Sequence, residues 1–230
     1  MEAKDSVHIT INGRHLTGEK GMTILDLAAQ NGIVIPTLCH RPELSPLGAC
    51  RLCVVEVEGS RTLVGSCHTP IAEGMVIHTN SSRVMEARFV IVELLLSTHA
   101  GNCFLCDKAN ICELRKIAAE LGVGIPRFKA RKRYYPVDDV SLYIERDLSK
   151  CILCRRCIRA CNEIAREPAG VLSIAYRGFD SKVIFGMDQP LDSEACRDCD
   201  ACVSLCPTGA LRRKRMPGSR KSGTALFITT

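Results

Sequence analysis

The chain has 230 residues and a formal net charge of +6, and 46% of its residues are hydrophobic. This length exceeds the usual size of one domain, so we expect two or three domains, each with its own small core. A basic excess can indicate nucleic-acid binding, but four tyrosines, six phenylalanines and no tryptophan leave few aromatic platforms for stacked bases. The composition therefore argues against a nucleic-acid partner.

Fifteen cysteines set the chain apart from an ordinary globular protein. The sequence begins without the apolar stretch of a signal peptide, so we expect a reducing, cytoplasmic compartment in which the thiols bind metal rather than form disulfides. The longest apolar run, around Phe89 to Leu96, is far too short to span a bilayer. We therefore expect no membrane insertion.

The first 80 residues predict a β-grasp domain of the ferredoxin type. Residues 7–11 alternate apolar and polar side chains, and Asn12-Gly13 is a two-residue turn signal, so a hairpin is expected with residues 14–17. Thr23 and Asp26 form a capping box that opens a helix ending at Gly32. Further strands are expected at residues 53–58, 62–65 and 75–79.

Four cysteines with the spacing C-x10-C-x2-C-x13-C lie in this first domain: Cys39, Cys50, Cys53 and Cys67. They are compatible with a [2Fe-2S] cluster, although the first gap is longer than in plant-type ferredoxins. The small residues Gly48 and Ala49 would let backbone N–H groups approach the cluster sulfurs. His40 and His68 adjoin two of the cysteines, but four thiolates suffice, so we interpret both as neighbours of the site or surface residues.

Residues 81–137 are expected to form a small helical domain. A helix over residues 83–97 is capped by residues 80–82 and has a polar stripe at Glu86, Glu93 and Ser97. Another helix follows Cys112 and ends at Gly122. The basic stretch up to Pro136 is interpreted as a solvated connector, with a docking surface as the alternative.

Between these two helices lie only three cysteines, which are Cys103, Cys106 and Cys112. A cubane cluster needs four protein ligands, and every other cysteine belongs to another group. His99 stands four residues before Cys103, and imidazole can bind iron. The sequence therefore predicts a [4Fe-4S] cluster with one histidine and three cysteine ligands.

Residues 138–215 contain an internal repeat of the run C-x2-C-x2-C-x3-C, and a tail of residues 216–230 follows. Such runs hold cubane clusters with three thiolates while the fourth reaches the neighbouring cluster. We therefore expect one [4Fe-4S] cluster on Cys151, Cys154, Cys157 and Cys206, and a second on Cys161, Cys196, Cys199 and Cys202. Residues 171–176 and 182–185 predict a hairpin between the two runs.

Arg155 and Arg156 lie between ligands of the first run. We interpret them as screening the cluster charge, with contact to a partner as the alternative. The sequence contains no P-loop, dinucleotide fingerprint, nucleophile elbow or zinc-protease motif. Four ligand sets without a catalytic residue or substrate site indicate an electron-transfer protein with an α+β fold.

The motifs together resemble those of known oxidoreductases over about residues 5 to 215. The most specific elements are Pro36-Thr-Leu-Cys39-His, Cys50-Arg-Leu-Cys53, the His99 set and the doubled run. In this combination the chain is similar to the diaphorase iron-sulfur subunit of bidirectional NAD(P)-linked [NiFe] hydrogenases and to the N-terminal region of the large iron-sulfur subunit of complex I. It also resembles the N-terminal parts of NAD-dependent formate dehydrogenase and iron-only hydrogenases.

The resemblance implies a hetero-oligomeric oxidoreductase in which this chain relays electrons between a flavin/NAD(H)-binding diaphorase subunit and the hydrogenase small and large subunits. The end at Thr230 leads us to expect the separate hydrogenase subunit. The equivalent relay in a formate dehydrogenase or a complex I-like NADH dehydrogenase is the alternative. A zinc protein that binds nucleic acid and a free multicluster ferredoxin stay as competing hypotheses.

Overall fold

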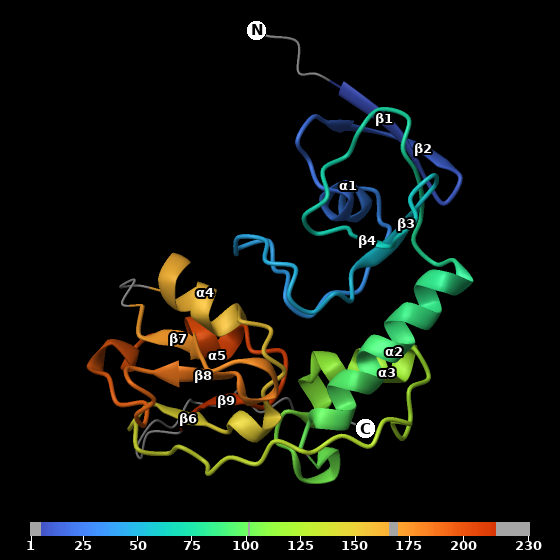
Figure 1. Cartoon of the computed structure of the whole chain (residues 1–230). Coiled ribbons are helices and arrows are strands. Elements are labelled where there is room, and N and C mark those ends of the chain that lie inside the picture. The colour runs from blue at the N-terminus through green and yellow to red at the C-terminus, as the bar shows by residue number, and fades with distance from the viewer. Residues whose placement is uncertain (1–5, 101, 166–169, 215–230) are drawn as a thin grey trace, which may run out of the picture.

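The computed structural model describes residues 6–100, 102–165 and 170–214. Figure 1 shows three successive parts: an N-terminal sheet around one helix, a pair of helices, and a C-terminal part with short strands and helices. No helix in these ranges combines the length and apolarity needed to cross a membrane. The sequence-predicted tail of residues 216–230 lies outside the described residues.

The N-terminal part is a mixed five-stranded sheet in the order β2-β1-β5-β3-β4. Its elements are β1 (Ser6–Ile11), β2 (Arg14–Glu19), α1 (Ile24–Gln30), β3 (Val54–Val57), β4 (Val64–Gly65) and β5 (Val76–His78). The predicted hairpin is confirmed, because β1 and β2 pair around Asn12 and Gly13, whose φ angles of 50° and 78° suit the tight turn. Ile11 of β1, Leu27 of α1 and Ile77 of β5 are buried in the core between sheet and helix.

Helix α1 begins at the predicted cap. The side chain of Thr23 accepts a hydrogen bond from the backbone N–H of Asp26 at 3.2 Å, and its hydroxyl donates to the Asp26 carboxylate. The chain leaves the helix through Gly32, whose φ of 72° favours glycine. These two ends fix where the chain turns toward the loop that carries Cys39.

The middle part consists of α2 (Ser82–Thr98) and α3 (Glu113–Glu120), which pack together in Figure 1. The expected polar stripe on α2 is wrong for two of its three residues, because Glu93 and Ser97 are only 1% and 3% exposed whereas Leu94 is 48% exposed. The backbone N–H and the guanidinium of Arg127 donate to the Glu93 carboxylate. These long-range partners let the carboxylate be buried, which periodicity alone does not predict.

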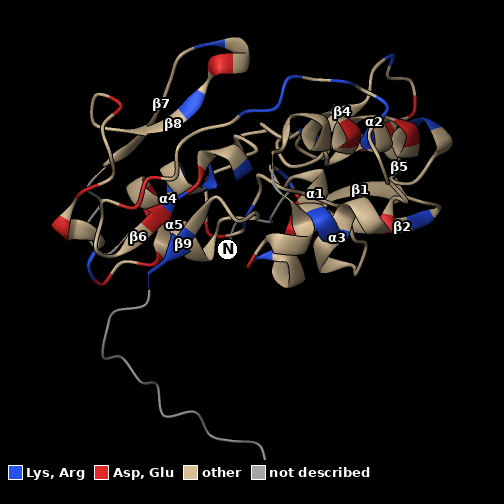
Figure 2. Ribbon diagram, turned by 90° about the horizontal axis from the view of Figure 1, so that it is seen from below, with Lys and Arg blue, Asp and Glu red and all other residues tan. Residues whose placement is uncertain are grey.

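The basic stretch after α3 is not a free connector. The Lys132 ammonium group donates to the carbonyls of Leu96 and His99 at 2.9 Å, so it binds the last turn of α2. The guanidinium groups of Arg131 and Arg133 lie over the Phe179 ring. In Figure 2 basic and acidic segments are interspersed along the ribbon. The linker therefore joins α2 to the C-terminal part.

The C-terminal part contains β6 (Ile144–Arg146), α4 (Arg156–Glu163), β7 (Leu172–Ala175), β8 (Lys182–Phe185), α5 (Ala201–Ser204) and β9 (Leu211–Arg213). Strand β6 pairs with β9, and β7 pairs with β8, so the hairpin predicted between the cysteine runs is confirmed. Helices α4 and α5 contact each other. The two copies of the cysteine run thus lie face to face.

Arg88 attaches α2 to the N-terminal part. Its side chain is buried and donates to the carbonyls of Leu52 at 3.2 Å and Val54 at 2.8 Å. Burial lowers the pKa of Arg88 to about 10, while the nearby Cys53 opposes that shift. The guanidinium therefore stays charged at neutral pH, and the two carbonyls that flank Cys53 depend on it.

Replacing Arg88 with methionine should lower the free energy of unfolding by about 2 kcal/mol, because two buried carbonyls lose their donor. Urea denaturation followed by the helical circular dichroism signal measures this change. Arg83→Met on the same helix is the control, since the Arg83 side chain is 48% exposed, and it should change stability by less than about 0.5 kcal/mol. Equal midpoints for the two variants would contradict the role given to Arg88.

Candidate iron-sulfur centres

The four cysteines of the N-terminal part lie together as two pairs. A hydrogen bond from the Cys50 thiol lowers the pKa of Cys39 to about 5, and one from the Cys67 thiol lowers the pKa of Cys53 to about 6. The pKa of each donor thiol is raised in turn, and Cys39, Cys50 and Cys53 all act electrostatically on Cys67. Two adjacent thiol pairs match a two-iron core, in which each iron takes two protein ligands.

Backbone N–H groups point at these sulfurs. The N–H of Leu38 donates to Cys50 Sγ at 3.4 Å, and the N–H of Cys50 donates to Cys39 Sγ at 3.5 Å. A hydrogen bond from the backbone of Ala49 also lowers the pKa of Cys39. Such donors stabilise negative charge on the sulfurs. The small residue at position 49 is thus placed as expected from the sequence.

His68 lies directly beside the same site. Its Nδ1 is 3.5 Å from Cys67 Sγ, and the ring packs over two glycines. A Cβ at Gly65 would lie 2.4 Å from the ring, and one at Gly48 would lie 3.1 Å from Nδ1. The glycines therefore leave the space that the imidazole fills, and His68 is a neighbour of the thiols, as expected from the sequence.

The middle group lies in the loop between α2 and α3. The thiols Cys103 and Cys106 both help to raise the pKa of Cys112, after the larger effect of burial. Cys112 directly precedes α3. A Cβ at Gly209 would lie 3.1 Å from Cys106 Sγ, so this loop also touches the chain just after Cys206. Three thiols are therefore within electrostatic reach of one another, next to the C-terminal part.

His99 is the C-cap residue that follows α2, and it is half-buried. Burial lowers the pKa of His99, and the positive charges of Lys132 and Lys150 lower it further. Its Nδ1 atom is buried without a hydrogen-bond partner among the described residues. A neutral imidazole with an unpartnered buried nitrogen fits a metal ligand, because an unsatisfied polar atom is otherwise costly.

The doubled run of the C-terminal part forms two cavities, each lined by four cysteines. One cavity is lined by Cys151, Cys154, Cys157 and Cys206. The other is lined by Cys161, Cys196, Cys199 and Cys202. Each cavity therefore receives three cysteines from one run and the last cysteine of the other, which is the crossed grouping predicted from the sequence.

Burial opposes ionisation of these thiols. It raises the pKa of Cys151 to about 11 and those of Cys154 and Cys202 to about 12, and it raises the pKa of Cys157 well above its ordinary value. A cationic iron core would offset this penalty, since metal binding deprotonates coordinating thiols. The cavities thus fit a group that is both positively charged and large enough to reach four separated sulfurs.

Across the described residues, no group of three or more His, Cys, Asp or Glu side chains is placed to hold one metal ion. Tetrahedral zinc would require four sulfurs within about 2.3 Å of one point.

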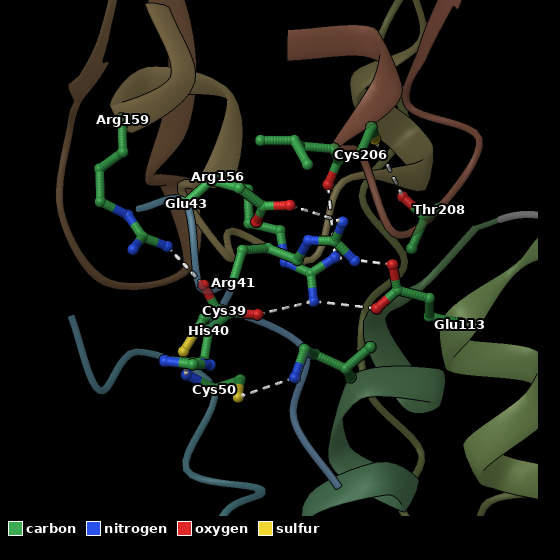
Figure 3. A network of polar contacts seen from close by, with 12 residues as sticks. Cys39, His40, Arg41, Glu43, Cys50, Glu113, Arg156, Arg159, Cys206 and Thr208 are labelled. Atoms are coloured by element: carbon green, nitrogen blue, oxygen red, sulfur yellow. Dashed lines mark hydrogen bonds and ion pairs between the residues drawn. The ribbon is translucent and has the colours of Figure 1, made fainter. Parts of the chain in front are cut away.

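Two arginines on α4, shown in Figure 3, have a role that was not expected from the sequence. Arg156 is 1% exposed, which rules out the alternative that it contacts a partner, and it is bound to Glu113 at 2.7 and 2.9 Å. Arg159 donates to the carbonyls of Cys39 and Ser45. The sequence did offer one indication of this burial. The spacing of the two arginines places them on the same helix face as Ala160, and all three residues are buried.

Comparison with known proteins agrees with this geometry. Residues 4–82 match the 2Fe-2S iron-sulfur cluster binding domain, residues 88–127 match the NADH-ubiquinone oxidoreductase-G iron-sulfur binding region, and residues 150–210 match the 4Fe-4S dicluster domain. The N-terminal match supports a [2Fe-2S] cluster, and the other two support [4Fe-4S] clusters.

The chain is 43% identical to subunit HndD of the NADP-reducing hydrogenase of Solidesulfovibrio fructosivorans, over 88% of this chain and 35% of that protein. It is 39% identical to a G-type NADH-quinone oxidoreductase subunit of Rhizobium meliloti, over 89% of this chain and 24% of that protein. The chain thus spans about a third or less of these relatives.

Among solved structures, a chain of an NAD+-reducing [NiFe]-hydrogenase in the H2-reduced state superposes with a TM-score of 0.78 at 28% identity, covering 93% of this chain and 90% of that one. The three cysteine-bearing parts therefore recur together in a known assembly. The chain is thus similar in sequence to a subunit of an NADP-reducing hydrogenase and to a G-type NADH-quinone oxidoreductase subunit, and similar in structure to a chain of an NAD+-reducing [NiFe]-hydrogenase.

Proposed function

We propose that this chain is the electron-transfer subunit of a cytoplasmic, hetero-oligomeric NAD(P)-linked hydrogenase. It relays electrons through one [2Fe-2S] and three [4Fe-4S] clusters between a flavin/NAD(H) module and a [NiFe] hydrogenase module. The observation that carries the proposal is the pair of four-cysteine cavities beside two further ligand groups. The likeness to a chain of an NAD+-reducing [NiFe]-hydrogenase over 93% of its length supports the choice of assembly.

The equivalent subunit of an NAD-dependent formate dehydrogenase or a complex I-like NADH dehydrogenase is a second candidate. The 39% identity to the NADH-quinone oxidoreductase subunit of Rhizobium meliloti favours this alternative. The metal of the co-purifying large subunit separates the candidates, since nickel would indicate a hydrogenase and molybdenum a formate dehydrogenase.

The ligand sets proposed for this function use every cysteine. The [2Fe-2S] ligands are Cys39, Cys50, Cys53 and Cys67, and the middle [4Fe-4S] ligands are His99, Cys103, Cys106 and Cys112. The two remaining [4Fe-4S] clusters take Cys151, Cys154, Cys157 and Cys206, and Cys161, Cys196, Cys199 and Cys202. We also propose the domain limits 1–80, 81–137 and 138–215 with a tail of residues 216–230.

When bound, the clusters supply reversible one-electron transfer. The residues of the chain hold the sulfurs in place, donate N–H groups to them and keep water away. In the C-terminal part all eight proposed ligands are buried or half-buried. The buried side chain of Leu148 lines one of the two cavities, and that of Leu191 lines the other. Cys103 differs, because its thiol is exposed. Cys103 is thus the most accessible of the proposed ligands, which supports a partner contact at the middle site.

Contacts between the three parts support one continuous relay. The backbone N–H of Glu113, next to Cys112, donates to the carbonyl of Pro207, next to Cys206, at 3.0 Å. Arg159, between Cys157 and Cys161, donates to the carbonyl of Cys39. The site formed around Cys206 thus lies between the N-terminal and middle groups, which suits a central position in the relay.

Anaerobically purified protein should be brown and contain about 14 iron atoms with as many sulfides per chain, two from the N-terminal site and four from each of the others. Metal and acid-labile sulfide analysis measures both quantities. A colourless preparation with zinc in place of iron would refute the proposal.

His99→Ala should remove the middle cluster, because a buried apolar side chain cannot replace the fourth ligand. Iron should fall by about four atoms per chain, or the cluster should lose one iron and become a three-iron form. Electron paramagnetic resonance of the reduced protein distinguishes the two results. His78→Ala is the control, since His78 pairs with Glu58 on the surface. Full iron content and an unchanged spectrum in His99→Ala would contradict ligation by His99.

A further inference from the structure

The guanidinium group of Arg156 contacts three segments of the chain, and each segment carries ligands of a different proposed cluster. Arg156 lies between Cys154 and Cys157 and donates to three partners: the Glu113 carboxylate, the His40 carbonyl at 3.1 Å and the Leu205 carbonyl at 3.4 Å. Each partner is the sequence neighbour of a proposed ligand, namely Cys112, Cys39 and Cys206. Figure 3 shows the side chains converging on this point.

The geometry of this junction requires an arginine. The planar guanidinium binds both Glu113 oxygens, at 2.7 and 2.9 Å, and still has donors for two carbonyls. Lysine could not reproduce this pattern, because its single ammonium group lacks the rigid fork. The Arg156 side chain is 1% exposed, so the guanidinium itself is shielded from solvent, whereas the Glu113 side chain is 37% exposed.

Two further side chains of α4 bind the N-terminal loop. Arg159 donates to the carbonyls of Cys39 and Ser45. The Glu163 carboxylate accepts from the backbone N–H and the hydroxyl of Ser45 at 2.8 and 2.6 Å. Helix α4 thus binds this loop at three positions, and its Arg156 also binds Glu113 of the middle part, whose backbone N–H donates to the Pro207 carbonyl as well.

We propose that Arg156 is a positioning residue that fixes the separations between the [2Fe-2S] site, the middle site and the site formed around Cys206. This inference rests on the proposed electron relay. Electron transfer slows steeply as the separation of two centres grows, so a side chain that holds three cluster-bearing segments together controls the rate between them. Arg156 touches their neighbouring residues and acts on the clusters only through these contacts.

The test compares Arg156→Gln, Arg156→Lys and the control Lys116→Gln in the full chain loaded with clusters. Lys116 lies on α3 with a 77% exposed side chain, and its replacement also removes one positive charge. We expect unchanged iron content in all three. In Arg156→Gln the fast spin relaxation of the reduced [2Fe-2S] signal, caused by its reduced neighbour, should be lost. Electron equilibration after photochemical reduction should slow by about tenfold, as expected when reacting centres shift slightly apart.

Arg156→Lys should behave like Arg156→Gln, because it keeps the charge without the fork. Wild-type relaxation and rate in Arg156→Lys would overturn the inference in favour of a simple charge effect.

If Arg156→Gln fails to fold, Glu113→Gln tests the same junction. It should weaken coupling to the middle site while leaving the [2Fe-2S] relaxation unchanged, and coupling equal to wild type at both sites would overturn the inference.

The wild-type chain separates this inference from the proposed function. If wild-type protein loaded with clusters shows no magnetic coupling between them, the relay itself is refuted and the positioning role falls with it. If the wild type shows coupling and Arg156→Gln shows the same coupling and rate, the relay stands and the role of Arg156 is refuted.

Discussion

The structure depends on the cost of placing many thiolates inside a protein. Burial raises the pKa of Cys154 and Cys202 to about 12, so these thiols resist ionisation when left to themselves. A positively charged inorganic core would offset that cost and would join the two cysteine runs, because each cavity takes cysteines from both. The free energy of binding such a core would also stabilise the folded state of the C-terminal part, which has few strands and only short helices.

The same constraint explains the arrangement of basic side chains. Arg88 donates to the carbonyls that flank Cys53, Lys132 donates to the carbonyl of His99, and Arg156 and Arg159 donate to the carbonyls of His40 and Cys39. In each case the cation binds the backbone of a proposed ligand or of its neighbour in sequence. Positively charged side chains thus lie at contacts between the parts, where they bind backbone carbonyls.

Features set by neighbouring residues were predictable from sequence. The Asn12-Gly13 hairpin and the Thr23 cap depend on local backbone chemistry, and both are present. The spacing also predicts the crossed grouping of cysteines, and the same two sets of four line the two cavities, while their binding of clusters stays a prediction. The placement of His99 could be approached only by counting ligands, and its buried Nδ1 adds a physical reason.

Features that depend on distant partners were not predictable. Glu93 is buried because Arg127 lies against it, and Arg156 is buried because Glu113, His40 and Leu205 surround it. A single sequence gives the polarity of each residue but not its partner, so periodicity assigned Glu93 to a polar stripe. The Glu93 error lies within the middle part, and the contacts of Arg156 lie where the three parts meet.

The most direct test of the account is an anaerobic structure of the loaded protein with iron located by anomalous scattering. The account predicts four separate iron centres, with Cys161 bound to the cluster of Cys196, Cys199 and Cys202, and with Cys206 bound to the cluster of the first run. A single ion at any of the four groups, or each run binding its own fourth cysteine, would contradict it.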